Sequence, residues 1–475
     1  MIQSAINNDK LLTSELAWRY KVALAESNDN SMILFVDEAV PDVNLSAKSE
    51  ELSLLTGRNI SFKKIPADEL LDKLNLYYTK QNHVDQRLQN SYYRGNPDYF
   101  LNDLINEAQQ LKSSDIHVEI YEGECRVRIR VDGLLVLRYI IEPKQYPALI
   151  NKIKIAANLD IAEKRLPQDG RIFHERNNEK FDIRVSIVPT LYGEKVVLRL
   201  LSNDATDIKL ENLGFSENDL INYKEGLKKP LGIILISGPT GSGKTTTLYA
   251  TIKVLNQTTK NILTVEDPIE YTLQGINQVQ VKENIGLSFA KALRTFLRQD
   301  PDIIMLGEIR DAETANMAIR AALTGHLVLS TIHTNSAWGT VSRLIDMNIP
   351  PFLIANTLNT SVAQRLVRLL CPNCKQEIPF DKNLFPKKFS PSEDVKTQYI
   401  PVGCPSCYNT GYKKRKAIYE VLPIDEELAE EIKRGSSRVD ELLKEKGIKS
   451  LSDNALELFK EGLTSLEEVY PMLMR

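Results

Sequence analysis

The segment Leu231 to Leu248 reads LGIILISGPTGSGKTTTL, an apolar run that passes into glycines and then into a helix-compatible stretch. We expect a strand, a phosphate loop and a helix in that order. Gly238, Gly241 and Gly243 allow the backbone to turn its N–H groups around phosphate oxygens, and the helix directs its positive end at the same anion. The segment therefore predicts an α/β fold arranged around a nucleotide-phosphate site.

The side chains of this loop match the GxxxxGKT spacing of phosphate loops. Lys244 is expected to reach the β- and γ-phosphates of ATP, and Thr245 to hold Mg²⁺ through its hydroxyl. A glycine-rich turn after a strand is common by chance, but here the strand, the full spacing and the helix coincide. The residues expected to contact nucleotide are Gly238, Pro239, Thr240, Gly241, Ser242, Gly243, Lys244, Thr245 and Thr246.

Three further strand candidates follow the loop, at Ile262 to Val265, Ile303 to Leu306 and Leu327 to Ile332, with helix-compatible stretches between them. Strands that alternate with helices indicate a mostly parallel sheet covered on both faces. In such sheets the ligand lies at the carboxyl ends of the strands. Polar residues at those ends are therefore candidates for the site.

Acidic residues stand at two of these strand ends. Glu266, Asp267 and Glu270 follow the first strand, and Glu308 follows the second. We expect Glu308 to polarise or deprotonate the attacking water. The alternative, a structural carboxylate, would more often lie on a helix face.

Two histidines lie beside the third strand. A single histidine there would usually be a satisfied core residue, but His326 and His333 are two of only five histidines in the chain. We therefore expect one of them to sense the γ-phosphate.

A second α/β region precedes the phosphate loop. Helical patterns at 98–111 and 144–158 accompany strand patterns of period two, and Asp132-Gly133 marks a hairpin turn between two strands. The expected strands are 115–121, 124–131, 134–141, 181–188 and 195–201.

Arginines interrupt two of these strands. Arg184 in DIRVSIV and Arg199 in VVLRLL lie between apolar neighbours, where a guanidinium needs a partner or an anion. The spacing alone favours a solvent-facing or salt-bridged arginine over a functional one. Arg165 and Arg171, in KRLPQDGR, leave the same alternatives open.

Four of the five cysteines form two C-x-x-C pairs near the C-terminus, Cys371 with Cys374 and Cys404 with Cys407. Each pair can place two thiolates at adjacent corners of a tetrahedron, and two pairs complete a closed structural Zn²⁺ site that leaves no position for water chemistry. The Lys-, Pro- and Ser-rich stretch between them has no large core, so zinc would supply its order. Cys125 is expected to be a small residue in a sheet.

Composition bounds the class of protein. The chain has 475 residues, 42% hydrophobic and 26% charged, and a net charge of −3. These values fit a multidomain globular protein and weaken a nucleic-acid role, which favours a basic stripe. We find no secretory signal pattern and no apolar run of about 18 residues, so a cytoplasmic protein is expected.

The two ends of the chain carry weaker patterns. Residues 1–80 mix short apolar runs with Asn-rich segments, as in a small α/β domain, and the polar stretch 81–97 is expected to be a linker. The basic run KKRK at 413–416 favours a solvated loop, with contact to a membrane surface or an acidic partner as the alternative. The C-terminal stretch is amphipathic and helix-compatible, with breaks at Gly435 and Gly462.

Four blocks, GPTGSGKTT, TVEDPIEY, RQDPDIIMLGEIRD and TGHLVLSTIHTN, together resemble the secretion ATPases of type II secretion and type IV pilus assembly. The resemblance extends to SDIHVE, KRLPQDGR, DIRVS, GEKVVLRLL, QRLVRLLC, the paired cysteines and the closing LTSLEEV, and covers about residues 98–475. It implies a RecA-like P-loop core preceded by a PAS-like α/β domain.

The resemblance also implies roles for individual residues. Gly307 stands where many P-loop proteins carry an aspartate for Mg²⁺, and the acidic box of Glu266, Asp267 and Glu270 is what the family offers instead. Glu308 matches the catalytic glutamate, and His326 and His333 the histidine box. Arg184 and Arg199 resemble arginines brought against the γ-phosphate when the second domain closes, which reverses the interpretation from spacing alone.

The family further implies a homo-hexamer at the bacterial inner membrane, bound through its N-terminal domain to the cytoplasmic part of a platform protein. The type II branch is the closer resemblance, with type IV pilus extension as the alternative. A nucleic-acid translocase and a non-hydrolysing scaffold are the rival classes; the charge argues against the first, and Lys244, Thr245 and Glu308 argue against the second.

The expected domains are an N-terminal partner-binding domain (1–80), a linker (81–97), the PAS-like domain with its arginines (98–205), the ATPase core (206–370), the zinc subdomain (371–415) and C-terminal helices (416–475).

Overall fold

The computed structural model describes residues 99–176, 179–201, 209–380, 384–386, 395–436 and 438–474, and in the N-terminal region 12, 16–17, 20–27, 31–41, 45, 48–49, 52–53, 56 and 58–77. The expected linker at 81–97 lies outside these residues. The chain divides into two compact units, one of 1–100, 119–127 and 137–149, and one of 101–118, 128–136 and 150–475. No helix in the described ranges is long and apolar enough to cross a membrane.

The N-terminal region forms a small α/β fold, as its composition indicated. Strand β1 (Val22–Ser27) pairs antiparallel with β2 (Ser31–Asp37), which pairs parallel with β3 (Asn59–Ile65). Helix α4 (Ala67–Tyr77) follows β3 directly. Alternate residues of β2 are buried, so one face of this sheet packs into the local core.

The middle region contains a six-stranded sheet in the order β6-β5-β4-β9-β8-β7. The five strands and two helices expected from the sequence are all present, and Asp132 and Gly133 both have positive φ at the β5–β6 turn. Strand β7 was not expected, because QDGRIFHER has only two strongly apolar residues, Ile172 and Phe173, and four charged ones. The elements are α6 (Phe100–Gln110), β4 (Asp115–Ile120), β5 (Cys125–Val131), β6 (Leu134–Ile141), α7 (Tyr146–Ala156), β7 (Gln168–Arg176), β8 (Glu179–Thr190) and β9 (Gly193–Leu201).

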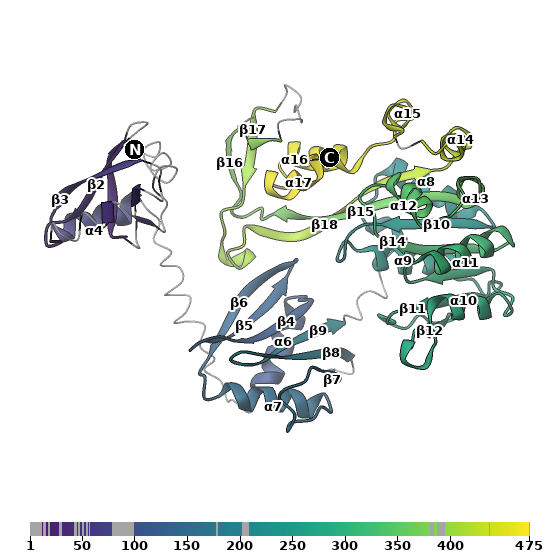
Figure 1. Cartoon of the computed structure of the whole chain (residues 1–475), viewed down its shortest axis with the longest axis horizontal. Helices are drawn as coiled ribbons and strands as arrows, with labels where there is room; N and C mark the ends of the chain where they lie inside the picture. The colour runs from purple at the N-terminus through teal and green to yellow at the C-terminus, as the bar shows by residue number, and fades with distance from the viewer. Residues whose placement is uncertain are drawn as a thin grey trace. The chain divides into compact units, whose positions relative to one another are not determined.

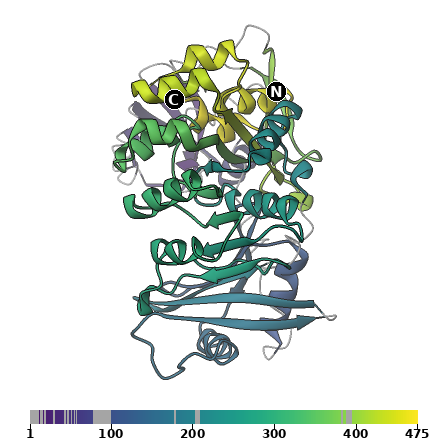
Figure 2. The same ribbon diagram turned by 90° about the vertical axis from the view of Figure 1, so that its right-hand side faces the viewer.

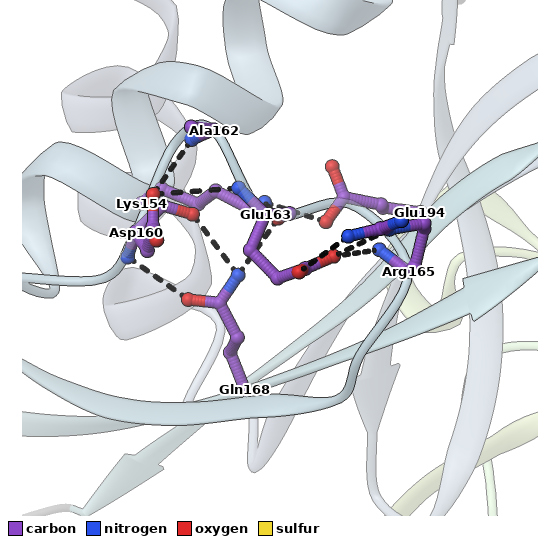
Figure 3. Close-up of polar contacts among 7 residues, drawn as sticks. All are labelled: Lys154, Asp160, Ala162, Glu163, Arg165, Gln168 and Glu194. Atoms are coloured by element: carbon purple, nitrogen blue, oxygen red, sulfur yellow. Dashed lines mark hydrogen bonds and ion pairs between the residues drawn. The ribbon is translucent and has the colours of Figure 1, made fainter.

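The chain enters β7 through a loop that is anchored by one buried lysine (Figure 3). Lys154 Nζ on α7 lies 2.6 Å from Glu194 Oε1 and donates to the Glu163 carbonyl at 2.6 Å. Gln168 closes the loop, since its Nε2 donates to the carbonyls of Asp160 and Glu163, both at 3.0 Å. Loss of one partner of such a buried pair typically costs about 3–5 kcal/mol, so this pair is important for the sheet. The side chain of Arg165 on the same loop is 89% exposed; its backbone N–H donates to Glu163 Oε1 at 2.6 Å, and its guanidinium lies 3.4 Å from the same carboxylate.

The core sheet has the order β12-β11-β13-β14-β10-β15-β18 and is parallel except for the edge strand β18 (Figures 1 and 2). This confirms the α/β fold class. Its strands are β10 (Gly232–Ser237), β11 (Ile262–Glu266), β12 (Asn277–Gln280), β13 (Ile303–Leu306), β14 (Leu327–Ile332), β15 (Leu358–Leu370) and β18 (Tyr412–Pro423). Its helices are α8 (Glu217–Lys228), α9 (Lys244–Leu255), α10 (Phe289–Phe296), α11 (Ala312–Leu323), α12 (Gly339–Asp346) and α13 (Pro351–Thr357).

Both faces of the core sheet are covered. Residues 233 and 235 of β10 pack into the cluster that holds α10, α11 and α12, whereas residues 234 and 236 pack into the cluster that holds α8 and α9. Because successive side chains of a strand point to opposite faces, a continuous apolar strand such as β10 requires helices on both sides.

The C-terminal region extends this sheet. The expectation of a loop at KKRK, 413–416, is wrong, because these residues lie in β18, whose pairing with the long β15 fixes them as a strand; Lys413, Lys414 and Arg415 are nevertheless exposed to solvent as expected. A short hairpin, β16 (Gln376–Pro379) with β17 (Thr397–Ile400), lies between the two long strands in sequence. The predicted helices are present as α14 (Glu426–Arg434), α15 (Asp440–Glu445), α16 (Leu451–Lys460) and α17 (Leu466–Leu473).

Candidate functional site

The phosphate loop connects β10 to α9 and has the backbone geometry that its glycines predict. Gly238 and Gly243 have φ values of 152° and 88°, and a Cβ at Gly238 would lie 2.5 Å from the Gln364 carbonyl oxygen. Glycine is therefore required there by both conformation and space. The Ser242 hydroxyl is buried and has no hydrogen-bond partner within the described chain. A phosphate oxygen in the loop would satisfy such a donor.

Lys244 opens helix α9 and turns back over the loop. Its Nζ donates to the carbonyls of Gly238 at 2.9 Å and Pro239 at 3.0 Å. Burial lowers the pKa of Lys244, and the nearby Glu308 carboxylate opposes that shift. The ammonium is thus held beside the helix N-terminus. The partial positive charge of the helix end and the full positive charge of Lys244 therefore act on the same anion position.

Glu308 follows β13 and lies beside the side chains of Arg310 and His333. Arg310 forms an ion pair with it, and His333 Nε2 lies 3.3 Å from its Oε2. Burial would raise the pKa of Glu308, but Arg310 and His333 outweigh burial and hold that pKa below its ordinary value. Glu308 is therefore ionised at neutral pH and suited to accept a hydrogen bond from water.

Glu266, at the end of β11, is almost fully enclosed, with 3% of the residue exposed. Its Oε1 accepts from Thr264 Oγ1 at 2.6 Å and from Gln278 Nε2 at 3.0 Å, and its Oε2 accepts from the Tyr249 hydroxyl. Both oxygens are thus occupied by donors from the chain itself. Asp267 and Glu270 are more exposed, and they contact Arg310 at 3.8 Å and Arg184 at 3.2 Å.

The two predicted arginines are direct neighbours in the middle sheet. Arg184 on β8 pairs in register with Arg199 on β9 and, on its other side, with Arg171 on β7. Like charges directly opposite each other are destabilising unless an anion or a carboxylate lies between them. Asp115 contacts Arg199 at 3.1 Å, and Asp182 contacts Arg171 at 3.6 Å.

Arg184 is the member of this row that reaches the acidic segment after β11. Its Nη2 donates to the Ile269 carbonyl at 2.7 Å and lies 3.2 Å from Glu270 Oε2. Its Nε is buried and has no hydrogen-bond partner in the described part of the chain. A guanidinium with a spare buried donor is well placed to bind a further anion.

These groups line one cavity of about 620 Å³. Most of the sequence-predicted residues of the nucleotide site meet there. The predicted residues in the lining are Thr240, Gly241, Ser242, Gly243, Lys244, Thr245, Thr246, Glu266, Asp267, Glu270, Glu308, His333, Arg184 and Arg199.

Gly238 and Pro239 lie in the phosphate loop but outside this lining, and His326 does not line the cavity either. His326 precedes β14, so it lies at the amino end of that strand, whereas His333 follows the carboxyl end. Its Nδ1 contacts the Ala321 carbonyl at 2.8 Å and Thr324 Oγ1 at 3.2 Å, at the end of α11. His326 therefore serves the helix-to-strand turn within this chain.

Two further cationic residues line the cavity and were not predicted. Arg310 pairs with Glu308, and Arg415, from the KKRK run, also contributes to the lining. Arg310 stands two positions after Glu308, a spacing that was visible in the sequence. Arg415 has no such signal, because its position depends on the pairing of β18 with β15.

The four paired cysteines form a separate cluster at the ends of β15 and β18. The Sγ atoms lie 3.9 Å apart for Cys371 and Cys404, 3.8 Å for Cys374 and Cys407, and 3.7 Å for Cys404 and Cys407. A tetrahedral site with Zn–S bonds of about 2.3 Å has edges of about 3.8 Å, whereas a disulfide needs about 2.05 Å. The donor set and spacing therefore fit one Zn²⁺.

Comparisons with known proteins agree with the motifs. The profile of the family described as "Type II/IV secretion system protein" matches residues 96–471. Type II secretion system ATPase E of Vibrio cholerae serotype O1 is 47% identical over 375 residues, covering 78% of this chain and 74% of the relative. Type IV pilus assembly ATPase PilB of Myxococcus xanthus is 49% identical over 383 residues, covering 78% of this chain and 66% of the relative.

Solved structures show the same fold. The pilus retraction motor PilT with bound ADP aligns with a TM-score of 0.53 at 26% identity, over 78% of this chain and 95% of that one. The Legionella pneumophila ATPase DotB aligns with a TM-score of 0.60 at 23% identity, over 81% of this chain and 98% of that one.

The cysteine cluster predicts that purified protein contains about one zinc per chain, since four thiolates close one tetrahedral site. Cys404→Ser should lose the metal and lower the melting temperature, whereas Cys125→Ser, which alters the buried cysteine of β5, should keep it. Elemental analysis by mass spectrometry measures both. A well-folded, zinc-free wild-type protein would contradict the assignment.

Proposed function

The chain belongs to the family of Type II/IV secretion system proteins, and from this premise we propose that it hydrolyses ATP to drive pseudopilus assembly and protein export through a type II secretion system. The observation that carries the proposal is the single cavity in which a phosphate loop, an ionised glutamate and paired arginines meet. Phosphoryl transfer to water needs these parts, because its catalysis is mainly positioning and charge stabilisation.

Each part has a proposed task. Lys244 and the loop N–H groups bind the β- and γ-phosphates, and the Thr245 hydroxyl together with Asp267 and Glu270 is suited to Mg²⁺, which neutralises phosphate charge when bound. Glu308 orients the attacking water, with His333 at its other side.

Arg184 and Arg199 are the arginine fingers of the proposal. They come from the middle sheet, whereas the phosphate loop comes from the core sheet, so closure of the two around ATP completes the site and excludes water. Such arginines are worth about 10³–10⁵ in rate. Arg184 of β8 and Arg199 of β9 supply charge that a triphosphate would neutralise.

The remaining expectations extend this proposal. The active form is a homo-hexamer at the cytoplasmic side of a bacterial inner membrane, and residues 1–80 bind the cytoplasmic part of a platform protein. The four cysteines hold a structural Zn²⁺ that orders the segment between β15 and β18. The domain limits drawn from the sequence stay a prediction.

Type IV pilus extension is the second candidate function, because a pilus assembly ATPase is 49% identical to this chain. This function would use the same ATP site and would differ only in the assembly that the ATPase drives. A nucleic-acid translocase is the more distant alternative, and no nucleic-acid partner is proposed.

Two variants test the enzymatic part of the proposal. Lys244→Ala should lose nucleotide binding and turnover, because it removes the charge that holds the phosphates. Glu308→Gln keeps the side-chain volume and should bind ATP but lose turnover by at least about 10²-fold. Phosphate release and binding of a fluorescent ATP analogue measure the two properties. Normal turnover by folded Glu308→Gln would remove this glutamate from the mechanism.

The branch is tested with the full-length chain as bait on detergent-solubilised membranes of its host, with captured proteins identified by mass spectrometry. We expect a type II secretion platform protein to be captured. Capture of a pilus-assembly platform protein instead would indicate that the chain drives type IV pilus extension.

A further inference from the structure

Tyr249 is a buried side chain outside the cavity lining. It lies on α9, the helix that begins with Lys244, and it is completely enclosed. Its ring packs edge-to-face against Tyr271, with the centroids 4.2 Å apart and the planes at 81°. A tyrosine fixed by an aromatic neighbour loses its rotamer freedom, so the hydroxyl has a defined position.

That hydroxyl bonds to both ends of the acidic segment 266–270. It donates to Glu266 Oε2, and it accepts the backbone N–H of Glu270 at 3.2 Å. Burial raises the pKa of Tyr249, and the Glu266 carboxylate adds to that rise, so the group remains a protonated donor. One oxygen atom therefore fixes the two ends of the segment to the helix.

Glu266 is the anchor of this arrangement rather than a free ligand. Thr264 and Gln278 occupy its other oxygen at 2.6 and 3.0 Å. A carboxylate with both oxygens bonded inside the protein has little capacity left for a metal ion. Asp267 and Glu270, which contact Arg310 and Arg184, are the carboxylates that remain available.

We propose that Tyr249 is a positioning residue, whose hydroxyl sets Asp267 and Glu270 relative to the phosphate loop by joining the helix after Lys244 to the acidic segment. The inference rests on the proposed ATP hydrolysis and adds a role to a residue outside the cavity lining. Because the same helix begins at the phosphate loop, the acidic segment and that loop are held as one rigid frame.

The test compares Tyr249→Phe with Tyr223→Phe in the full chain. Tyr223, on α8, is equally buried. Its hydroxyl forms a hydrogen bond of 2.8 Å with Thr251 Oγ1 on α9, the helix that also carries Tyr249, and not with the acidic segment. Each variant keeps its ring and loses one buried hydroxyl. Thermal stability, binding of a fluorescent ATP analogue with and without Mg²⁺, and the Mg²⁺ dependence of turnover are measured for both.

We expect Tyr249→Phe to bind the analogue without Mg²⁺ as the wild type does, and to lose most of the Mg²⁺-dependent gain in binding. Its kcat should fall by about 10- to 100-fold, since a misplacement of about 1 Å can cost about 10²-fold. Tyr223→Phe should lose stability alone. If Tyr249→Phe does not fold, Gln278→Met, which removes another donor to Glu266, takes its place with the same expected direction.

Wild-type Mg²⁺ dependence and kcat in folded Tyr249→Phe, or equal losses in Tyr223→Phe, would overturn the inference while the proposed function stands. Absence of turnover in the wild type would overturn the proposed function together with it.

Discussion

The parallel strands β11, β13, β14 and β10 all end at one edge of the core sheet, and the site depends on this shared edge. A parallel ladder aligns the carboxyl ends of strands that are distant in sequence. It therefore brings the phosphate loop after β10, the acidic segment after β11, Glu308 after β13 and His333 after β14 to one cavity. His326, which precedes β14, lies at the opposite end of that strand.

Charge balance is the second feature that organises the cavity. Lys244, Arg310, Arg184 and Arg199 surround a space that also contains Glu308, Asp267 and Glu270. Within the described chain Arg310 pairs with Glu308 and Arg184 with Glu270. When a triphosphate and its metal bind, their contacts with these side chains would replace some of the ion pairs. Nucleotide binding is therefore coupled to rearrangement of the ion pairs.

The sequence predicted the parts whose signal is local, and missed those that depend on tertiary contacts. The strand ends, the phosphate loop and the paired cysteines were visible because their function fixes residue type and spacing. Strands β15 and β18 were missed because their buried polar residues, such as Gln364, bond to Thr247 at 2.9 Å on a distant helix. The role of Glu266 was obscured because a carboxylate at a strand end looks the same whether it faces ligand or core. The position of His326 at the amino end of β14 could have been predicted from the sequence, because His326 precedes the apolar strand residues.

The central claim is that an arginine of the middle sheet acts on the phosphates held by the core sheet. The most direct measurement compares single-turnover ATP hydrolysis and nucleotide affinity in Arg184→Gln and Arg171→Gln. Arg171 is the in-register neighbour of Arg184 on β7 but does not line the cavity. The account predicts that Arg184→Gln binds nucleotide but loses about 10³-fold or more in rate, while Arg171→Gln keeps its rate. Turnover near the wild-type value in folded Arg184→Gln, or an equal loss in Arg171→Gln, would contradict it.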